Sequence, residues 1–300
     1  MSMTTLIWIT LVLLSVFFVY ILYKDFVKHQ KMLENISSMK TAAIGFVVNF
    51  FDVLGIGAFA PQTALLKFTR QTEDRVLPGT LNVANTIPVL IQALIFIQIV
   101  EVEPITLVSM LLSATAGAIL GAGIVSRLAV KKIQITMGIA LLVTAFFMLA
   151  GQMNWIQGGG EAIGLSGWKL ALAVGVNFLL GAFMTVGVGL YAPCMALVYA
   201  LGLSPLVAFP IMMGSCAFLM PPASAKFIKE GAYNRKAAVS MAIPGAIAVL
   251  IAALVVKSLP LDTLRWVIIA VIIYTSVSMF RSAWQRKSIA LTEPATRQII

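Results

Sequence analysis

Charged residues are scarce in this sequence. Asp, Glu, Lys and Arg make up 11% of its 300 residues, against about a quarter in ordinary soluble domains. Hydrophobic residues make up 60%, and the mean hydropathy is +1.00. A soluble domain cannot bury so large an apolar fraction and still cover its surface with polar side chains. The composition therefore excludes a soluble protein and predicts an all-α polytopic membrane protein.

Cysteine and histidine are nearly absent. Cys194 and Cys216 lie in apolar runs, and His29 is the only histidine. This pattern indicates neither a disulfide framework nor a zinc site, so we expect no metal and no cofactor. No carboxylate pair, Ser/His/Asp set, phosphate-binding loop or HExxH motif lies in a context that supports chemistry, which argues against an enzyme.

The net charge of +10 would suggest nucleic acid in a soluble protein. Here Lys and Arg gather in short segments between apolar runs, as they do in the cytoplasmic loops of membrane proteins. We therefore expect the lipid bilayer as partner and no nucleic acid. A homodimer is compatible with the sequence, and the oligomeric state stays open.

The apolar runs define the organisation of the chain. The first, Leu6 to Tyr23, lacks a cleavage site and is followed by four lysines, which predicts a retained N-terminal transmembrane anchor rather than a signal peptide. Further runs lie at about 42–66, 78–100, 105–126, 133–152, 169–200, 204–225, 237–256 and 263–280. We divide the chain into the anchor and a basic loop (1–41), repeat 1 (42–152), a linker (153–167), repeat 2 (168–283) and a cytoplasmic tail (284–300).

The two repeats are indicated by matches at a nearly constant offset. Gly-Ile-Gly-Ala-Phe-Ala-Pro at 55–61 returns as Gly-Val-Gly-Leu-Tyr-Ala-Pro at 187–193. Ala64-Leu65 and Pro78 recur 132 residues later, and Val108-Ser109-Met110 recurs 131 residues later. Several matches in one order make a duplication the best explanation, and many transporters are built from such repeats.

Charge predicts how the repeats are oriented. If runs 42–66 and 169–200 each enter the membrane and return to the same side, 18 of the 21 Lys and Arg fall in cytoplasmic loops. Lys169, Lys257 and Arg265 alone remain outside. Each repeat is then a broken re-entrant hairpin plus three transmembrane helices, so the two repeats are inverted. The N-terminus is expected outside and the C-terminus in the cytoplasm of a bacterial or archaeal cell.

Each hairpin breaks at Gly-x-Gly and resumes with Pro61 or Pro193, a residue favoured in the first turn of a helix. Two half-helix N-termini would then meet near the bilayer midplane, and their free N–H groups and positive dipoles suit an anion. The competing explanation is that the glycines only allow tight helix packing. The candidate substrate-binding residues are Gly55, Gly57, Ala58, Phe59, Thr80, Asn82, Gly187, Gly189, Leu190, Tyr191, Gly214 and Ser215.

Two charged residues are further candidates. Asp52 is a lone acid in an apolar hairpin, which favours a functional role. Protonated, it would donate a hydrogen bond to an anion and couple transport to protons, whereas a structural cap is the alternative. Lys226 is a candidate counter-charge, or else a lysine that marks the membrane interface. For Thr80, Asn82 and Ser215, hydrogen bonding between helices is the competing role.

These motifs resemble the sulfite exporter TauE/SafE family of permeases. The resemblance covers about 42–283 and rests on the glycine-rich break followed by proline, then Pro78-Gly79-Thr80 and Gly214-Ser215 in the next span. The family's usual glycine triplet is altered here, to Gly55-Ile56-Gly57-Ala58 and Gly187-Val188-Gly189-Leu190. The resemblance implies transport of small anions such as sulfite, sulfoacetate or related organosulfonates. An anion channel is the alternative, and the Met and Cys residues near 184–220 leave a soft-metal or thiol transporter as a weaker one.

Overall fold

The computed structural model describes residues 3–155, 160–187, 189–255 and 261–292, and within these ranges the chain is helical with no β-strand. Residues 156–159 of the expected linker and 293–300 of the expected tail lie outside the described residues. The helices are α1 (Met3–His29), α2 (Ser38–Asp52), α3 (Phe59–Phe68), α4 (Leu77–Ile99), α5 (Pro104–Val125), α6 (Val130–Gln152), α7 (Gly167–Met184), α8 (Tyr191–Ala200), α9 (Ala208–Lys229), α10 (Arg235–Val255) and α11 (Leu261–Thr292), with 3₁₀ turns at Gln30–Met32 and Pro205–Val207.

Seven of the described helices are long and apolar enough to cross a membrane, which identifies a membrane protein. They correspond to the expected anchor, to five of the six expected spans, and to the first part of run 169–200, which is expected to be re-entrant. Side chains on their outer faces are apolar and exposed, for example Leu13, Val16 and Leu254. The seven are α1, α4, α5, α6, α7, α9 with its preceding turn, and α10.

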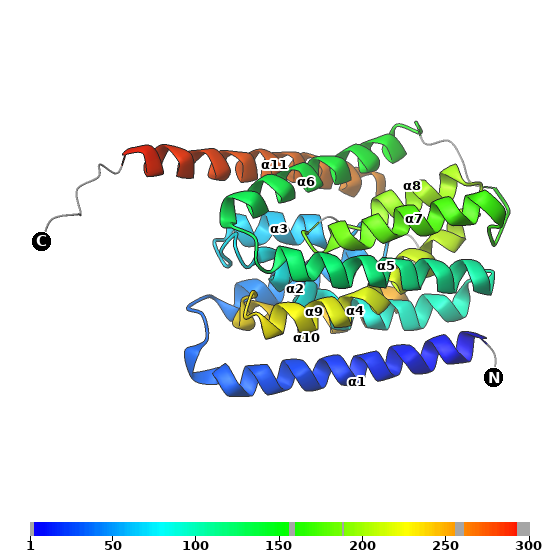
Figure 1. Ribbon diagram of the computed structural model, residues 1–300, viewed down its shortest axis with the longest axis horizontal. Helices are drawn as coiled ribbons and strands as arrows, with labels where there is room; N and C mark the ends of the chain where they lie inside the picture. Colours follow the sequence, from blue (N-terminus) through cyan, green and yellow to red (C-terminus); the bar gives the residue numbers. More distant parts are fainter. Residues whose placement is uncertain (1–2, 156–159, 188, 256–260, 293–300) are drawn as a thin grey trace, which may run out of the picture.

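The two expected broken runs are each split into two helices. Run 42–66 becomes α2 and α3, separated by 53–58, and run 169–200 becomes α7 and α8, separated by 185–190. The long helices lie side by side along the long axis of the molecule, with α1 on one side and α6 and α11 on the other (Figure 1).

Helices of the two halves pack against each other in matched pairs. The first helix of each broken pair packs along α5 or α10 of the other half, so that α2 contacts α10 and α7 contacts α5. α4 packs on α9 and α6 on α11. Backbones approach closely at these contacts, because a Cβ at Gly45 would meet the Met241 backbone and one at Gly181 would meet the Ala114 backbone.

Prolines lie inside three long helices without ending them. Pro88 is within α4, Pro244 within α10, and Pro221 and Pro222 within α9. The sequence predicts a disturbance at Pro221-Pro222, but α9 continues through both to Lys229. Neighbouring helices in a membrane bundle often compensate the hydrogen bonds that proline removes.

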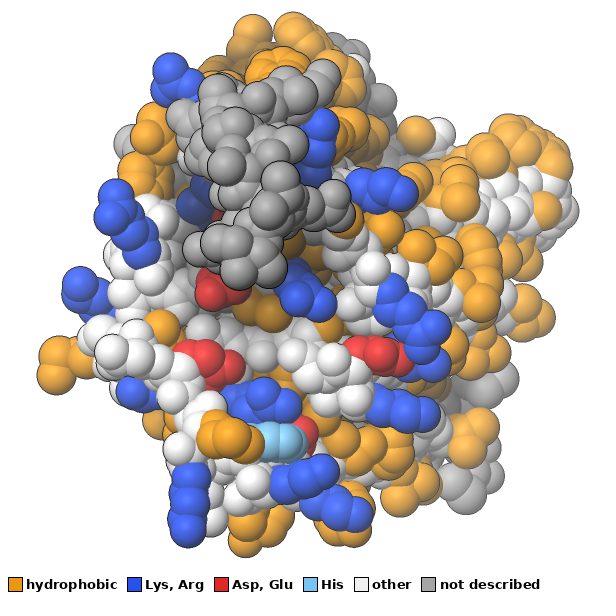
Figure 2. All heavy atoms as spheres, turned by 60° about the vertical axis from the view of Figure 1, so that its left-hand side comes forward, with side chains coloured by type: hydrophobic (Ala, Val, Ile, Leu, Met, Phe, Trp, Pro, Cys, Tyr) orange, Lys and Arg blue, Asp and Glu red, His pale blue; other side chains and the backbone are white. Residues whose placement is uncertain are grey.

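One end of the molecule gathers most of the charged loops, and we call it the charged end. It carries 24–40, 67–75, 127–132 and 226–236, and Figure 2 shows Lys and Arg spread around it together with acidic side chains and the histidine. Ion pairs of Lys and Arg with acidic side chains lie there: Asp25 with Arg235 at 2.7 Å, Lys67 with Asp74 at 2.9 Å, and Arg127 with Glu230 at 2.8 Å.

The opposite end is formed by three less charged segments. The Glu103 N–H donates to the Ile163 carbonyl at 2.9 Å, and the Ser204 N–H donates to the Ala162 carbonyl at 2.8 Å. The segments around 100–104, 160–167 and 201–205 therefore lie together, away from the charged end.

The two broken pairs return to different ends. The Ser37 N–H, just before α2, donates to Gln71 Oε1 at 2.9 Å, just after α3. Lys169 in the first turn of α7 donates to the Leu201 carbonyl, just after α8, at 3.2 Å. The α2–α3 pair therefore has its base at the charged end, and the α7–α8 pair has its base at the opposite end.

Candidate functional site

The first break depends on two glycines. α2 ends at Asp52 and α3 begins at Phe59, and between them Gly55 and Gly57 have φ values of 80° and 91°. Side chains disfavour these left-handed angles, which explains glycine at both positions. Pro61 follows in the first turn of α3, where its missing N–H costs nothing.

The second break resembles the first but is not identical. α7 ends at Met184, α8 begins at Tyr191, and Gly187 has a φ of 105°. A Cβ at Gly189 would contact nothing within 4 Å. Left-handed φ values therefore explain glycine at Gly55, Gly57 and Gly187, and the absence of a side chain at Gly189 keeps space open.

The two breaks meet at a small buried cavity. Gly57 and Tyr191 face each other across it, since a Cβ on Gly57 would lie 3.8 Å from Tyr191 Cβ. The residues that precede α3 and α8, Ala58 and Leu190, make no side-chain capping hydrogen bond, and both N-terminal turns present backbone N–H groups and positive dipole ends to this region. The residues that line the cavity are Asp52, Gly57, Ala58, Phe59, Val89, Met184, Gly189, Leu190, Tyr191 and Cys216.

The cavity is closed in this conformation. Its volume is about 10 Å³, which is room for one water molecule at most. A polyatomic anion would fit only if the two breaks moved apart.

A chain of hydrogen bonds joins the two breaks beside this cavity. The Tyr191 hydroxyl donates to Gln92 Oε1 at 2.8 Å, and Gln92 Nε2 donates to Asp52 Oδ2 at 2.7 Å. Gln92 lies on α4 and is fully buried, and Asp52 is 2% exposed. Asp52 Oδ1 has no hydrogen-bond partner among the described residues, although the backbone N–H groups of Gly57 and Ala58 lie close to the carboxylate.

Sulfur atoms form another part of the wall. Cys216 Sγ lies 3.4 Å from Met184 Sδ, and both residues are buried. Among the described residues no three His, Cys, Asp or Glu side chains gather in a way that could hold a metal ion.

Five of the expected site residues lie away from the cavity. Thr80 is near the charged end, where its hydroxyl accepts from the Asn234 N–H, and Asn82 donates to the Pro78 carbonyl. The Ser215 hydroxyl accepts from Asn177, Gly214 packs on Leu111, and Lys226 lies beside Gly123 in α5. Of the remaining candidates, Gly55 and Gly187 lie within the breaks but do not line the cavity, and the cavity is lined by Gly57, Ala58, Phe59, Gly189, Leu190, Tyr191 and Asp52.

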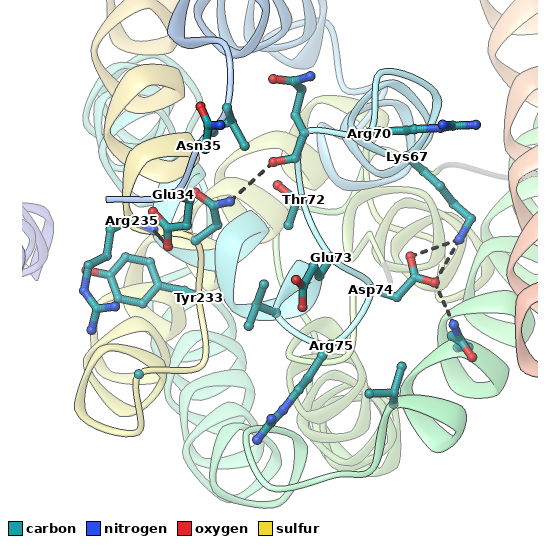
Figure 3. Close-up of a pocket in the computed structure, with 17 residues that line it drawn as sticks. Glu34, Asn35, Lys67, Arg70, Thr72, Glu73, Asp74, Arg75, Tyr233 and Arg235 are labelled. Atoms are coloured by element: carbon teal, nitrogen blue, oxygen red, sulfur yellow. Dashed lines mark hydrogen bonds and ion pairs between the residues drawn. The ribbon is translucent and has the colours of Figure 1, made fainter. Parts of the chain in front are cut away.

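Two larger cavities lie on either side of the closed one. A vestibule of about 1000 Å³ opens at the charged end and is lined by polar side chains of 67–76 and 231–235 (Figure 3). A crevice of about 300 Å³ between α6 and α8 is lined by Gly55 and Ile56 of the first break and also by Gln152 and Asn154 near the opposite end. The two breaks therefore lie between cavities that belong to different ends of the molecule.

Sequence reasoning missed Gln92 and Val89, and it considered Met184 and Cys216 only for the weaker soft-metal alternative. A signal existed for Gln92, because it is an amide in a predominantly apolar run. Val89, Met184 and Cys216 are ordinary apolar or weakly polar residues of a membrane helix, and nothing in the sequence assigns them to an anion cavity.

Comparison of the chain with models of known families, with curated proteins and with solved structures found no match.

Proposed function

We propose that this chain is a secondary membrane transporter of small anions, which bind between the N-terminal turns of α3 and α8. The observation that carries the proposal is that two sequence-equivalent breaks line one buried cavity, with the N-terminal turns of α3 and α8 facing it. Backbone N–H groups at helix N-termini bind anions without a positively charged side chain. The resemblance to TauE/SafE permeases supports sulfite, sulfoacetate or similar organosulfonates as the substrate class.

We also propose that the two halves are inverted repeats with re-entrant hairpins. The matched helix pairs support this arrangement, as do the bases of the two broken pairs at opposite ends. Such repeats alternate access by moving relative to each other around a central site. The closed cavity between the vestibule and the crevice then corresponds to an occluded state of a carrier.

Asp52 is proposed to couple the anion to a proton. As a carboxylate it would repel an anion next to Gly57 and Ala58. As a carboxylic acid it would donate a hydrogen bond to the anion, so that proton and anion favour each other's binding.

The proposal is tested by anion flux in proteoliposomes. A carrier should take up labelled sulfite or a small sulfonate faster than protein-free liposomes, and preloading with the unlabelled anion should accelerate uptake by exchange. Conductance without such acceleration would instead indicate an anion channel. Failure to move any anion in the panel would contradict the proposed function.

The topology gives a second test. We expect the charged end to be cytoplasmic, because 18 of 21 Lys and Arg lie in loops assigned to that side. Met39→Cys and Ser282→Cys should react with an impermeant thiol reagent from the cytoplasm, and Ser204→Cys from the outside. Gly160 is expected outside as well, whereas 157–159 lie outside the described residues. Reaction of Ser204→Cys only from the cytoplasm would mean that 169–200 crosses the membrane once, and would refute the inverted repeat.

A further inference from the structure

A cluster of amide side chains is buried between α2, α3 and α4. Asn85 donates to Gln62 Oε1 at 2.6 Å, and its own Oδ1 accepts from Gln62 Nε2 at 2.9 Å and from Asn49 Nδ2 at 3.1 Å. All three residues are fully buried. Polar groups are costly in the interior of a membrane protein and usually mark a pathway or a site.

The cluster lies on helices that carry further buried polar side chains between Asp52 and the vestibule. Asn49 precedes Asp52 by one turn of α2, and Gln92, which donates to Asp52, lies two turns beyond Asn85 on α4. Toward the charged end the same helix carries Thr86, Asn82 and Thr80. We call the residues Asn49, Asp52, Gln62, Thr63, Thr80, Asn82, Asn85, Thr86 and Gln92 the polar lane.

One end of the polar lane contacts residues that line the vestibule. The Thr80 hydroxyl accepts from the Asn234 N–H at 2.9 Å, and Asn234 Nδ2 donates to the Gln71 carbonyl at 3.3 Å. Asn234, Gln71 and Thr72 all line the vestibule, and Thr72 is labelled in Figure 3. Polar groups therefore extend from the charged end to the carboxylate between the breaks.

Side-chain atoms without a hydrogen-bond partner concentrate along this route. Seven buried side-chain oxygen atoms of the described residues lack a partner, and six belong to the lane or to the vestibule. Buried polar atoms that lack a protein partner are usually satisfied by water. The six are Asn49 Oδ1, Asp52 Oδ1, Thr63 Oγ1, Thr72 Oγ1, Asn82 Oδ1 and Gln134 Oε1.

The second half carries no such lane. Residues 132 positions later are mostly apolar or contain sulfur, although Gln92 is matched by the small hydroxyl of Ser224. Asn49 is matched by Gly181, Asp52 by Met184, Gln62 by Cys194, Thr63 by Met195, Thr80 by Met212, Asn82 by Gly214, Asn85 by Ala217 and Thr86 by Phe218. The buried polar side chains of the lane therefore belong to the first half of the molecule, and most equivalent positions in the second half lack them.

We propose that the polar lane holds water and connects Asp52 to the charged end, while the second half seals Asp52 from the opposite end. A proton arriving as hydronium passes to the Asp52 carboxylate, leaving neutral water and a carboxylic acid. This inference rests on the proposed coupling role of Asp52 and specifies from which side, and past which residues, its proton comes. Water and small cations are the ligands that the lane accepts, because its side chains are uncharged amides and hydroxyls.

The test is the accessibility of single cysteines to Ag⁺, which is close in size to water. Cys194 and Cys216 are replaced by Ala, and Asn85→Cys is compared with Ala217→Cys, the equivalent residue of the second half; both native side chains are fully buried. Ag⁺ applied at the charged end should block later maleimide labelling of Asn85→Cys about tenfold faster than that of Ala217→Cys, because a thiol in a dry core reacts only after local opening. Thr63→Cys, a nearly isosteric change, should behave like Asn85→Cys.

Equal rates at Asn85→Cys and Ala217→Cys, or reaction of Asn85→Cys and Thr63→Cys only from the opposite end, would overturn the inference. A second experiment measures transport by Asn85→Leu. This variant should lose pH-driven accumulation of the anion but keep anion exchange. The control Asn177→Leu removes an equally buried amide of α7 and should leave the response to pH intact. If the unmodified protein moves no anion, the proposed function fails while the Ag⁺ rates still decide whether the lane is hydrated.

Discussion

Replacing Gly57 with Leu should abolish anion transport while leaving membrane insertion largely intact. Gly57 has a φ of 91°, and a side chain held in this left-handed region costs about 1–3 kcal/mol. A leucine would also project toward Tyr191, whose Cβ lies 3.8 Å from the position of a Cβ on Gly57. The initial rate of anion uptake at equal protein density, with size-exclusion chromatography as the check on folding, measures the effect.

Gly189 provides the matched control, because it lines the same cavity and a Cβ there would meet no atom within 4 Å. Gly189→Ala should retain most of the uptake, whereas Gly57→Ala should lose most of it. Gly189→Leu should abolish uptake as Gly57→Leu does, because a large side chain there fills a cavity of only about 10 Å³. Wild-type rates in Gly57→Leu and Gly189→Leu would mean that these glycines serve helix packing alone.

Asp52→Asn should uncouple the anion from the pH gradient. An asparagine keeps the shape of the protonated acid, and its carbonyl oxygen can still accept the hydrogen bond from Gln92 that Asp52 Oδ2 accepts at 2.7 Å. Anion binding and exchange should therefore persist, whereas the cavity loses the only side chain that gains a proton when the anion enters. Accumulation driven by an imposed pH gradient should fall to the level of passive equilibration.

The measurement compares uptake under a pH gradient with exchange in its absence, in the wild type and in Asp52→Asn. Glu101→Gln, which neutralises an exposed carboxylate near the opposite end, is the control and should behave like the wild type. Gradient-dependent accumulation in Asp52→Asn would show that Asp52 is a structural residue of the first break.

Much of the fold follows from local patterns in the sequence. Apolar runs end where Lys, Arg, Glu or Pro occur, so the predicted and observed bounds of α4, α5 and α9 differ by only a few residues. The breaks were predictable because glycine allows backbone angles that interrupt a helix, and proline is favoured in the first turn of the helix that follows. Inside α9 the helix continues through Pro221-Pro222, because packing against neighbouring helices decides whether a proline ends a helix.

The candidate site was predictable only where it is local in the chain. Gly57, Ala58, Gly189 and Tyr191 come together because each lies in a break or at the start of the helix that follows it. Thr80 lies about three turns of α4 away from Gln92. It therefore does not reach the cavity, although it lies in the span that follows the first break. The Tyr191–Gln92–Asp52 chain joins three helices that are far apart in sequence, and no spacing rule predicts such a contact.

The measurement that tests the central claim most directly is uptake of a panel of small labelled anions by proteoliposomes that contain either the wild type or Gly57→Leu at equal density. The account predicts that the wild type takes up sulfite or a small sulfonate well above protein-free liposomes, and that Gly57→Leu falls to their level. Equal uptake by the two proteins would contradict an anion site between the breaks, and no uptake of any anion by the wild type would contradict anion transport itself.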